Sequence, residues 1–306
     1  MAYTFRAPTL DDLPAVAAVV REAELADYGE AEDRTEELQV GFGFVDAERD
    51  AWLVESGDGQ VVGAGLVRVR HPTQLRGFAA VSPAHTGRGI GTDLLARIET
   101  RARELAEQAP KGETVSLGQD VAPANEAART LLERHGYALV RHFWKMAIDL
   151  DGEPSEPAWP EGISVSTMAP GEERAIFDAS EDAFQDHWGF VPHDYDEWRA
   201  WTVERESFDP SLWLIARDED EIAGVSMCYA APDAGWVGVL GVRRPWRRQG
   251  LGLALLLESL RALRRHGMTR AALHVDASNP TGATHLYERA GMHVVNQSDL
   301  YKKELR

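Results

Sequence analysis

The sequence predicts a mixed α/β protein made of two similar domains, each a sheet with helices on both faces. First, the two halves match, because Trp52, Gly63 and Gly91 recur in similar contexts 161 positions later. Second, residues 151–162 contain three prolines, two glycines and four acids, which is typical of a linker. Third, each half begins with strands in a row and continues with strand-helix-strand units, an order that predicts a mixed sheet. We therefore expect domains at 1–150 and 163–306, joined by the linker 151–162.

The order of elements is the same in both halves. We expect an opening strand, a helical segment, two strands joined by a tight turn, a strand before a glycine loop, and the next strand of the sheet. The ranges are 3–7, 13–25, 52–70, 75–81 and 114–121 in the first half, and 163–167, 173–184, 213–230, 236–242 and 270–277 in the second. An amphipathic helix follows each glycine loop, and Gly267 is a plausible stop for the second one. A short helix and a closing strand complete each half.

Charge and composition exclude several classes of function. The chain has 50 acidic and 32 basic residues, a formal net charge of -18, which disfavours nucleic acid and anionic membranes as partners. Its single cysteine, Cys228, lies in an apolar run, which predicts a buried structural thiol and excludes an internal disulfide. We expect a cytoplasmic protein, because the sequence has no apolar run of about 18 residues and no recognisable secretion signal. Four arginines within residues 243–248 therefore suggest a small anionic ligand.

The glycine loop of the second half has the composition of a phosphate site. A strand ending at Val242 and a helix beginning near Leu253 would direct unpaired backbone N–H groups and the positive end of the helix dipole at one point. Gly250 and Gly252 would let phosphate oxygens approach the backbone. A purely structural turn would also explain two glycines. A Walker loop is excluded because no Gly-Lys-Ser/Thr is present, and the third glycine of a dinucleotide fingerprint is missing.

Residues 247–252, RRQGLG, resemble the pyrophosphate loop of the GNAT superfamily of acetyl-CoA-dependent N-acetyltransferases, whose pattern is Arg/Gln-x-x-Gly-x-Gly/Ala. Downstream, Asn279 and Tyr287 stand where the family has an Asn that contacts pantetheine and a Tyr near the thioester sulfur. The resemblance implies two tandem acyl-CoA N-acyltransferase domains, acetyl-CoA as cosubstrate, a small-molecule amine as acceptor and no metal. It also implies that Tyr287 protonates the departing thiolate. Sheet packing of a half-buried tyrosine is the alternative.

The resemblance further implies a set of cofactor contacts on both halves. The strand before the loop is expected to diverge from its neighbour, so that its backbone bonds pantetheine and holds the acetyl carbonyl. The expected contacts are Leu240, Gly241, Val242, Arg247, Arg248, Gln249, Gly250, Leu251, Gly252 and Asn279 in the second half, and Val81, Arg88, Gly89, Ile90 and Gly91 in the first.

The general base is not identified by the sequence. Many family members carry a carboxylate on the central strand, yet residues 236–242 have none. His274 and Asp276 alternate along the next strand and so share one face, where they could act as base or form a surface pair. Substrate contacts are expected in residues 184–201, with Asp186, His187 and Trp188 as candidates; a packed helix end is the alternative.

The first half departs from the family pattern. Thr86 stands at the first position of the loop motif and Leu132 at the position of the tyrosine, whereas Asn125 is retained. We therefore expect a degenerate first domain and a catalytic second domain. The tandem layout also resembles the mycothiol synthase type, which acetylates the cysteinyl amine of a sugar-inositol precursor, but that layout alone does not assign the substrate. A non-catalytic acyl-CoA sensor is the alternative function, and the sequence does not give the oligomeric state.

Overall fold

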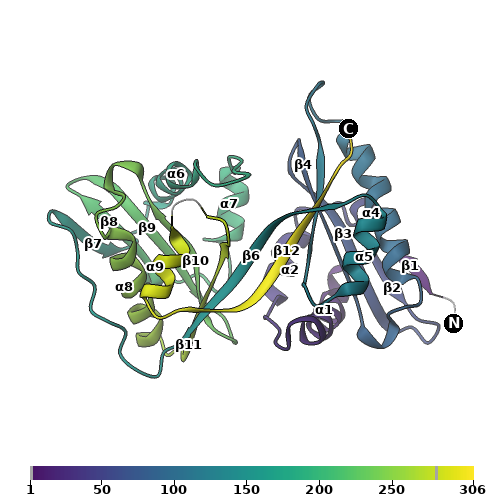
Figure 1. Cartoon of the computed structure of the whole chain (residues 1–306), viewed down its shortest axis with the longest axis horizontal. Helices are drawn as coiled ribbons and strands as arrows, with labels where there is room; N and C mark the ends of the chain where they lie inside the picture. The colour runs from purple at the N-terminus through teal and green to yellow at the C-terminus, as the bar shows by residue number, and fades with distance from the viewer. Residues whose placement is uncertain (1–2, 280–281) are drawn as a thin grey trace. The chain divides into compact units, whose positions relative to one another are not determined.

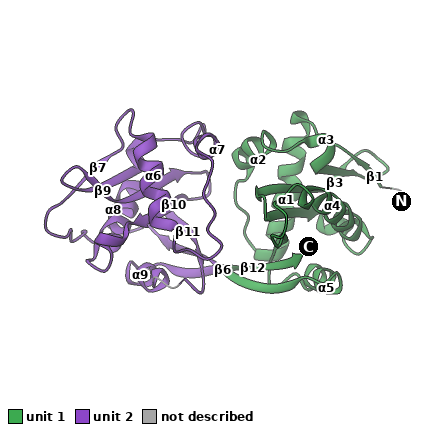
Figure 2. Ribbon diagram, turned by 90° about the horizontal axis from the view of Figure 1, so that it is seen from above, with its two compact units in different colours: residues 1–142, 297–306 green, residues 143–296 purple. Residues whose placement is uncertain are grey.

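The computed structural model describes residues 3–279 and 282–306 (Figure 1). The chain divides into two compact units: residues 1–142 with 297–306, and residues 143–296 (Figure 2). Each unit is a mixed sheet with helices on both faces, which confirms the predicted fold class. Among the described residues, none of the helices combines the length and the apolar character needed to span a membrane.

Unit 1 has the strand order β1-β2-β3-β4-β5, with β12 beside β5. Val16, Val19 and Val20 of α1 pack on one face of the sheet, and Leu95 and Ile98 of α4 pack on the other. Its elements are β1 (Thr4–Arg6), α1 (Leu13–Tyr28), α2 (Thr35–Phe42), α3 (Ala47–Asp50), β2 (Ala51–Glu55), β3 (Val61–His71), β4 (Gln74–Val81), α4 (Ile90–Ala106), β5 (Ser116–Val121) and α5 (Glu126–Arg134).

Unit 2 repeats this plan with the order β7-β8-β9-β10-β11, and β6 lies beside β11. Ile176 and Phe177 of α6 pack on one face, and Leu256 and Leu260 of α8 on the other. Its elements are β7 (Ile163–Thr167), α6 (Glu173–Phe184), α7 (Tyr195–Trp201), β8 (Trp213–Asp218), β9 (Glu221–Ala230), β10 (Gly235–Val242), α8 (Leu251–Arg265), β11 (Arg270–Asp276) and α9 (Ala283–Arg289). Gly267, at φ +94°, follows the end of α8 as expected.

The two closing strands are exchanged between the halves of the sequence. Strand β6 (Ala138–Asp149) leaves the first half and pairs antiparallel with β11 through residues 143–149. Strand β12 (His293–Glu304) leaves the second half and pairs antiparallel with β5 through residues 299–304. Met146 on β6 is fully buried in the core of unit 2, and Tyr301 on β12 is buried in the core of unit 1. The predicted domains 1–150 and 163–306, with the linker 151–162, describe the two copies in the sequence and stay a prediction. The last strand of each copy pairs within the unit formed mainly by the other copy.

In both units a pair of parallel strands diverges just before a glycine loop. Strands β10 and β11 pair only at Gly235 with Ala271 and Trp236 with Ala272, over the described residues of both strands. Beyond Trp236, a register shift against β9 between Val237 and Val239 marks a β-bulge, a device that redirects a strand. In unit 1, β4 and β5 likewise pair only from residues 74 to 76 and 116 to 118. The structure therefore has the strand separation that the family resemblance implies.

Candidate functional site

The loop after β10 presents open backbone donors at the start of α8. A short 3-10 helix, Arg244–Trp246, leads to Arg248 at φ +64° and Gly250 at φ +89°, and α8 begins at Leu251. No side chain caps this helix. Its first N–H groups therefore face outward with the positive end of the helix dipole, which is the arrangement that binds phosphate. At Gly252 the helix packs closely on α9, since a Cβ there would lie 3.0 Å from Leu286 Cδ1.

Arg247 fastens this loop to the end of α6. Its Nε donates to the Val242 carbonyl oxygen at 2.9 Å, one Nη to the Ala183 carbonyl oxygen at 3.0 Å, and the other to Asp186 at 2.6 Å. Arg244 also donates to Asp186, through Nε at 3.0 Å and through Nη2. Hydrogen bonds from Arg244 and then Arg247 hold the Asp186 pKa well below its usual range. We call Arg244, Arg247 and Asp186 the loop clamp.

Arg248 differs from its neighbours because it is exposed and makes no ion pair within residues 3–279 and 282–306. Arg243 pairs with Asp182 at 2.7 Å, so three of the four arginines of this segment are held by carboxylates of the α6 end. The sequence suggests that all four arginines bind an anionic ligand. Instead, Asp182 and Asp186 neutralise three of them. The described contacts leave Arg248 as the loop arginine available for an anion.

Replacing Arg248 with glycine should move stability and ligand binding in opposite directions. A non-glycine residue at φ +64° is strained by about 1 kcal/mol or more, and glycine removes that strain. The first copy already has Gly87 at the matching place, at φ +72°. We expect R248G to leave the free energy of unfolding unchanged or slightly higher and to weaken acetyl-CoA binding about tenfold at low salt, less at high salt. Urea unfolding and calorimetric titration measure both, and unchanged affinity at low salt would contradict the role of Arg248.

Tyr287 lies on α9, buried against α8 and β11. Burial raises its pKa to about 12, so the phenol is protonated at neutral pH. Its hydroxyl has no hydrogen-bond partner within the region of the chain that the structure describes. The group is thus a protonated hydroxyl that no described residue engages in a hydrogen bond. Cys228 is also buried, and burial raises its pKa to about 11, as expected for a structural thiol.

The candidates for base and substrate contacts lie on the opposite face of the sheet from Tyr287. Leu273 and Val275 join the core that contains Tyr287, so His274 and Asp276 point to the other face. His274 packs on the Trp236 ring at 5.1 Å, near the paired end of the strands. Asp276 accepts a hydrogen bond from the Ser278 N–H at 2.8 Å in the turn after β11. These two contacts place His274 and Asp276 at opposite ends of their stretch of β11, on the face away from Tyr287.

His187 lies in the segment between α6 and α7, beside the diverging strands. Its ring contacts the Phe184 ring, with centroids 4.3 Å apart, and its backbone N–H donates to the Phe184 carbonyl oxygen. Phe184 in turn packs on Gly241 of β10, where a Cβ would lie 3.1 Å from the Phe184 ring. Burial lowers the pKa of His187, and the charge of Arg247 lowers it further, against opposing contributions from Asp276 and Asp186. Trp188 is 40% exposed.

The remaining predicted cofactor contacts surround the same loop. The Gln249 side chain donates to the Pro245 carbonyl oxygen at 3.1 Å and so braces the turn. Leu251 is buried beneath it, and Leu240 and Val242 pack against the same cluster. The Asn279 N–H donates to the Asp276 carbonyl oxygen at 3.0 Å, so Asn279 follows directly on β11. Tyr287, the loop and residues 240–242 are thus brought to one end of β10 and β11.

The first copy keeps the loop's backbone but changes its side chains. Gly87 and Gly89 have φ values of +72° and +88°, and α4 begins at Ile90, followed by Gly91. Arg88 donates to the Tyr3 hydroxyl at 3.2 Å. Val81 closes β4 opposite Gly63. The helix geometry of a phosphate site is therefore retained in this copy.

Two residues remove the rest of the second copy's machinery from the first. Leu132 is buried where the second copy has Tyr287, and leucine cannot donate a proton. Asn125 caps α5 by accepting from the Ala128 N–H at 3.0 Å, and its amide donates to Asp27 at 3.0 Å. In the first copy the asparagine is therefore held by protein groups at the end of α1 and the start of α5.

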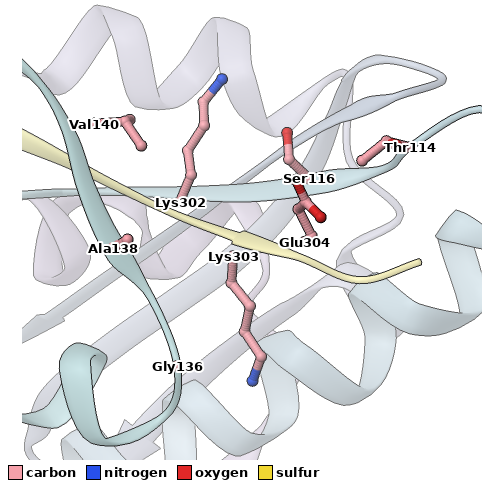
Figure 3. A pocket seen from close by; sticks show the side chains of 8 residues that line it. All are labelled: Thr114, Ser116, Gly136, Ala138, Val140, Lys302, Lys303 and Glu304. Carbon is pink, nitrogen blue, oxygen red and sulfur yellow. The ribbon is translucent and has the colours of Figure 1, made fainter.

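A hollow in unit 1 lies apart from the predicted site. Its lining comes from Thr114, Ser116, Gly136, Ala138, Val140, Lys302, Lys303 and Glu304 (Figure 3). The figure shows Lys302 and Lys303 pointing to opposite sides of β12. Lys303 bonds Glu99 at 2.8 Å beneath the sheet. None of the predicted site residues lines this hollow. Within the described residues, no group of three or more His, Cys, Asp or Glu side chains is arranged to hold a metal ion.

Sequence reasoning missed two features that build the site. The sequence pattern does not distinguish Arg244 from its neighbours, although acids at positions 182 and 186, four apart, indicate partners for the loop arginines. Phe184 was included only within the segment 184–201. Its contact with Gly241 could have been suspected from a glycine inside a strand, which often marks close approach of another group.

Comparisons with known proteins agree with this geometry. The model of the acetyltransferase (GNAT) family matches residues 17–137 and 174–292. A mycothiol acetyltransferase of Streptomyces scabiei is 30% identical over 95% of this chain and 91% of its own length. One of Geodermatophilus obscurus is 32% identical, covering 93% and 92%.

Solved structures extend the likeness to the whole chain. A GCN5-related N-acetyltransferase from Sphaerobacter thermophilus has a TM-score of 0.85 and 37% identity, covering 99% of this chain and 96% of that one. A tandem GNAT protein from the clavulanic acid biosynthesis pathway has a TM-score of 0.75 and 20% identity, covering 100% and 99%, and so supports the fold alone. The chain is therefore a tandem N-acetyltransferase of the GNAT family, homologous over most of its length to proteins named mycothiol acetyltransferase.

Proposed function

We propose that the second copy transfers the acetyl group of acetyl-CoA directly to a primary amine of a small molecule. The observation that carries the proposal is the junction of β10, β11 and α8, where diverging strands meet an uncapped helix start and a buried, protonated Tyr287. The diphosphate would bind the N–H groups of residues 248–252, and pantetheine would lie along residues 240–242 and Asn279. The amine nitrogen would attack the thioester carbon, and Tyr287 would protonate the departing sulfur.

Catalysis is assigned to the second copy because the two copies differ where chemistry is needed. Leu132 replaces the tyrosine in the first copy, so that copy has no hydroxyl where the second has its proposed proton donor. The first copy keeps the glycine loop, with φ values within a few degrees of the second at Gly89 and Gly250. We propose that it retains a structural role and the backbone of a cofactor site without the proton donor.

The acceptor favoured by the relatives' names is the cysteinyl amine of the mycothiol precursor. Support comes from identities of 30% and 32% over more than nine tenths of the chain. Such identities allow the acceptor to differ, because few side chains decide substrate choice in a shared fold. The cysteinyl sugar-inositol is therefore the first acceptor to test, followed by aminoglycosides and polyamines.

An amine panel tests the proposal. Acetyl-CoA is incubated with each acceptor, and products are identified by mass spectrometry, because a thiol-bearing acceptor would confound a colorimetric assay of released CoA. An S-methyl derivative of the cysteinyl acceptor separates N-acetylation from S-acetylation. We expect an N-acetyl product with at least one acceptor. Acetyl-CoA binding without transfer to any amine would favour the non-catalytic sensor instead.

A further inference from the structure

We propose that His187 is the general base of the reaction, taking a proton from the incoming ammonium group on the face of the sheet opposite Tyr287. This inference rests on the proposed transferase function and supplies the base that β10 lacks, since residues 235–242 contain no carboxylate. Three properties of His187 carry it: where the side chain lies, how it is held, and which charges surround it.

His187 is linked through Phe184 to β10, the strand that forms one wall of the gap. Ala183 and Phe184 lie on Gly241, where an added Cβ would come within 3.0 Å and 3.1 Å of them. The His187 ring contacts Phe184, and its charge environment includes Asp276 at the end of β11. Because Asp276 points away from the core that holds Tyr287, His187 and Tyr287 approach the diverging strands from opposite faces. An amine that approaches from one face would therefore meet His187, and a thiolate that leaves on the other face would meet Tyr287.

The loop clamp fixes the segment that carries His187 against the cofactor loop. Asp186, its chain neighbour, is bound by Arg244 and by Arg247 at 2.6 Å. Arg247 also binds the carbonyl oxygens of Val242 and Ala183. The clamp therefore ties three segments, the end of β10, the cofactor loop and the end of α6, so that a base on the last is positioned by the others. Asp186 is accordingly a positioning residue rather than a contact for a cationic substrate.

The surrounding charges suit a base at neutral pH. Burial and the Arg247 cation lower the His187 pKa, while Asp186 on its own segment and Asp276 on β11 oppose that shift. The imidazole is therefore neutral at pH 7 and able to accept a proton, whereas a raised pKa would leave it already charged.

The proton balance of the reaction closes with these two groups. His187 takes one proton from the ammonium group, and the neutral nitrogen attacks the thioester carbon to form a C–N bond. As the C–S bond breaks, the Tyr287 hydroxyl gives its proton to sulfur and regains one from water, while the acylated nitrogen loses its second proton to water. The imidazolium then releases its proton to water. One ammonium ion and one thioester thus yield an amide, free CoA and one proton.

The test is the pH dependence of the defect in H187Q. The acceptor is the S-methyl cysteinyl sugar-inositol, or the best-used amine of the panel if the native protein does not acetylate that compound. Below the amine's pKa we expect kcat/KM to fall about a hundredfold. The loss should shrink towards none as pH rises and the amine becomes neutral by itself. Acetyl-CoA affinity should stay unchanged by calorimetry.

A matched control and a positioning variant complete the experiment. His266 follows the C-terminal end of α8, at the opposite end of that helix from the cofactor loop, and lies 3.5 Å from Asp209, so H266Q should retain native activity. D186N should lower kcat/KM and shift the His187 ionisation towards lower pH, because Asp186 opposes the lowering of that pKa, but the loss should not disappear at high pH as it does in H187Q. A loss in H187Q that is equal at every pH, or no loss, would overturn the assignment of His187. Absence of transfer by the native protein would instead refute the proposed function.

Discussion

Replacing Tyr287 with phenylalanine should lower kcat about 10²- to 10³-fold while leaving the Kd of acetyl-CoA unchanged. The change removes one hydroxyl, which carries the proton proposed to reach the leaving sulfur. Since this hydroxyl has no partner among the described residues, its loss should not lower the free energy of unfolding measurably. Rates of acetyl transfer, calorimetry and urea unfolding measure the three quantities on one preparation.

Tyr137 provides the matched control for this variant. It is buried in unit 1 and directly precedes β6, outside the proposed catalytic machinery. Y137F should therefore leave kcat unchanged. If Y287F kept native kcat, or lost activity only in proportion to weaker acetyl-CoA binding, Tyr287 would not be the proton donor.

A cavity made in an exchanged strand should destabilise the unit that the strand completes. For β12, from the second half of the sequence, that is unit 1, and for β6, from the first half, it is unit 2. Tyr301 is 1% exposed in the core of unit 1 and bonded to Glu133 and Arg129, so Tyr301→Ala should cost unit 1 about 3–5 kcal/mol. Met146 is fully buried in unit 2, so Met146→Ala should cost unit 2 about 2–5 kcal/mol. The two variants should destabilise different units, so each serves as the control for the other.

Hydrogen exchange measured by mass spectrometry distinguishes the two units. Amides of α4 report on unit 1 and those of α8 on unit 2, since both helices pack on their unit's core. Tyr301→Ala should speed exchange in α4 and spare α8, and Met146→Ala should do the reverse. If Tyr301→Ala instead loosened α8, the last strand would belong to its own half in solution, and the exchange would be wrong.

Much of this fold follows from local sequence signals. The helix expected at 173–184 matches α6, and the strand expected at 163–167 matches β7, because helical and alternating apolar patterns mark such elements directly. The exchange of β6 and β12 could not be predicted. Residues 138–149 and 293–304 are similar in pattern, and pattern fixes that a segment is a strand, not which strand it pairs with.

The sequence predicts the backbone geometry of the site, because glycines mark positions with positive φ. It predicts less well which side chains pair with one another. Gly250 has the positive φ that a glycine at a tight strand-to-helix turn suggests. The arginines suggest ligand contacts in the sequence, yet Arg243, Arg244 and Arg247 bind Asp182 and Asp186. The arginine count and the predicted helix end both suggest an anion site, and only the fold shows that three of the four arginines are bound by carboxylates of the chain itself.

The central claim is that acetyl-CoA docks at residues 248–252 with its pantetheine arm in the gap between β10 and β11. A crystal structure of the full chain grown with acetyl-CoA tests it most directly. We expect diphosphate oxygens within hydrogen-bond distance of the backbone N–H groups at the start of α8, and the thioester between Tyr287 and His187. Acetyl-CoA bound elsewhere on the second copy, with β10 and β11 closed against each other, would contradict it.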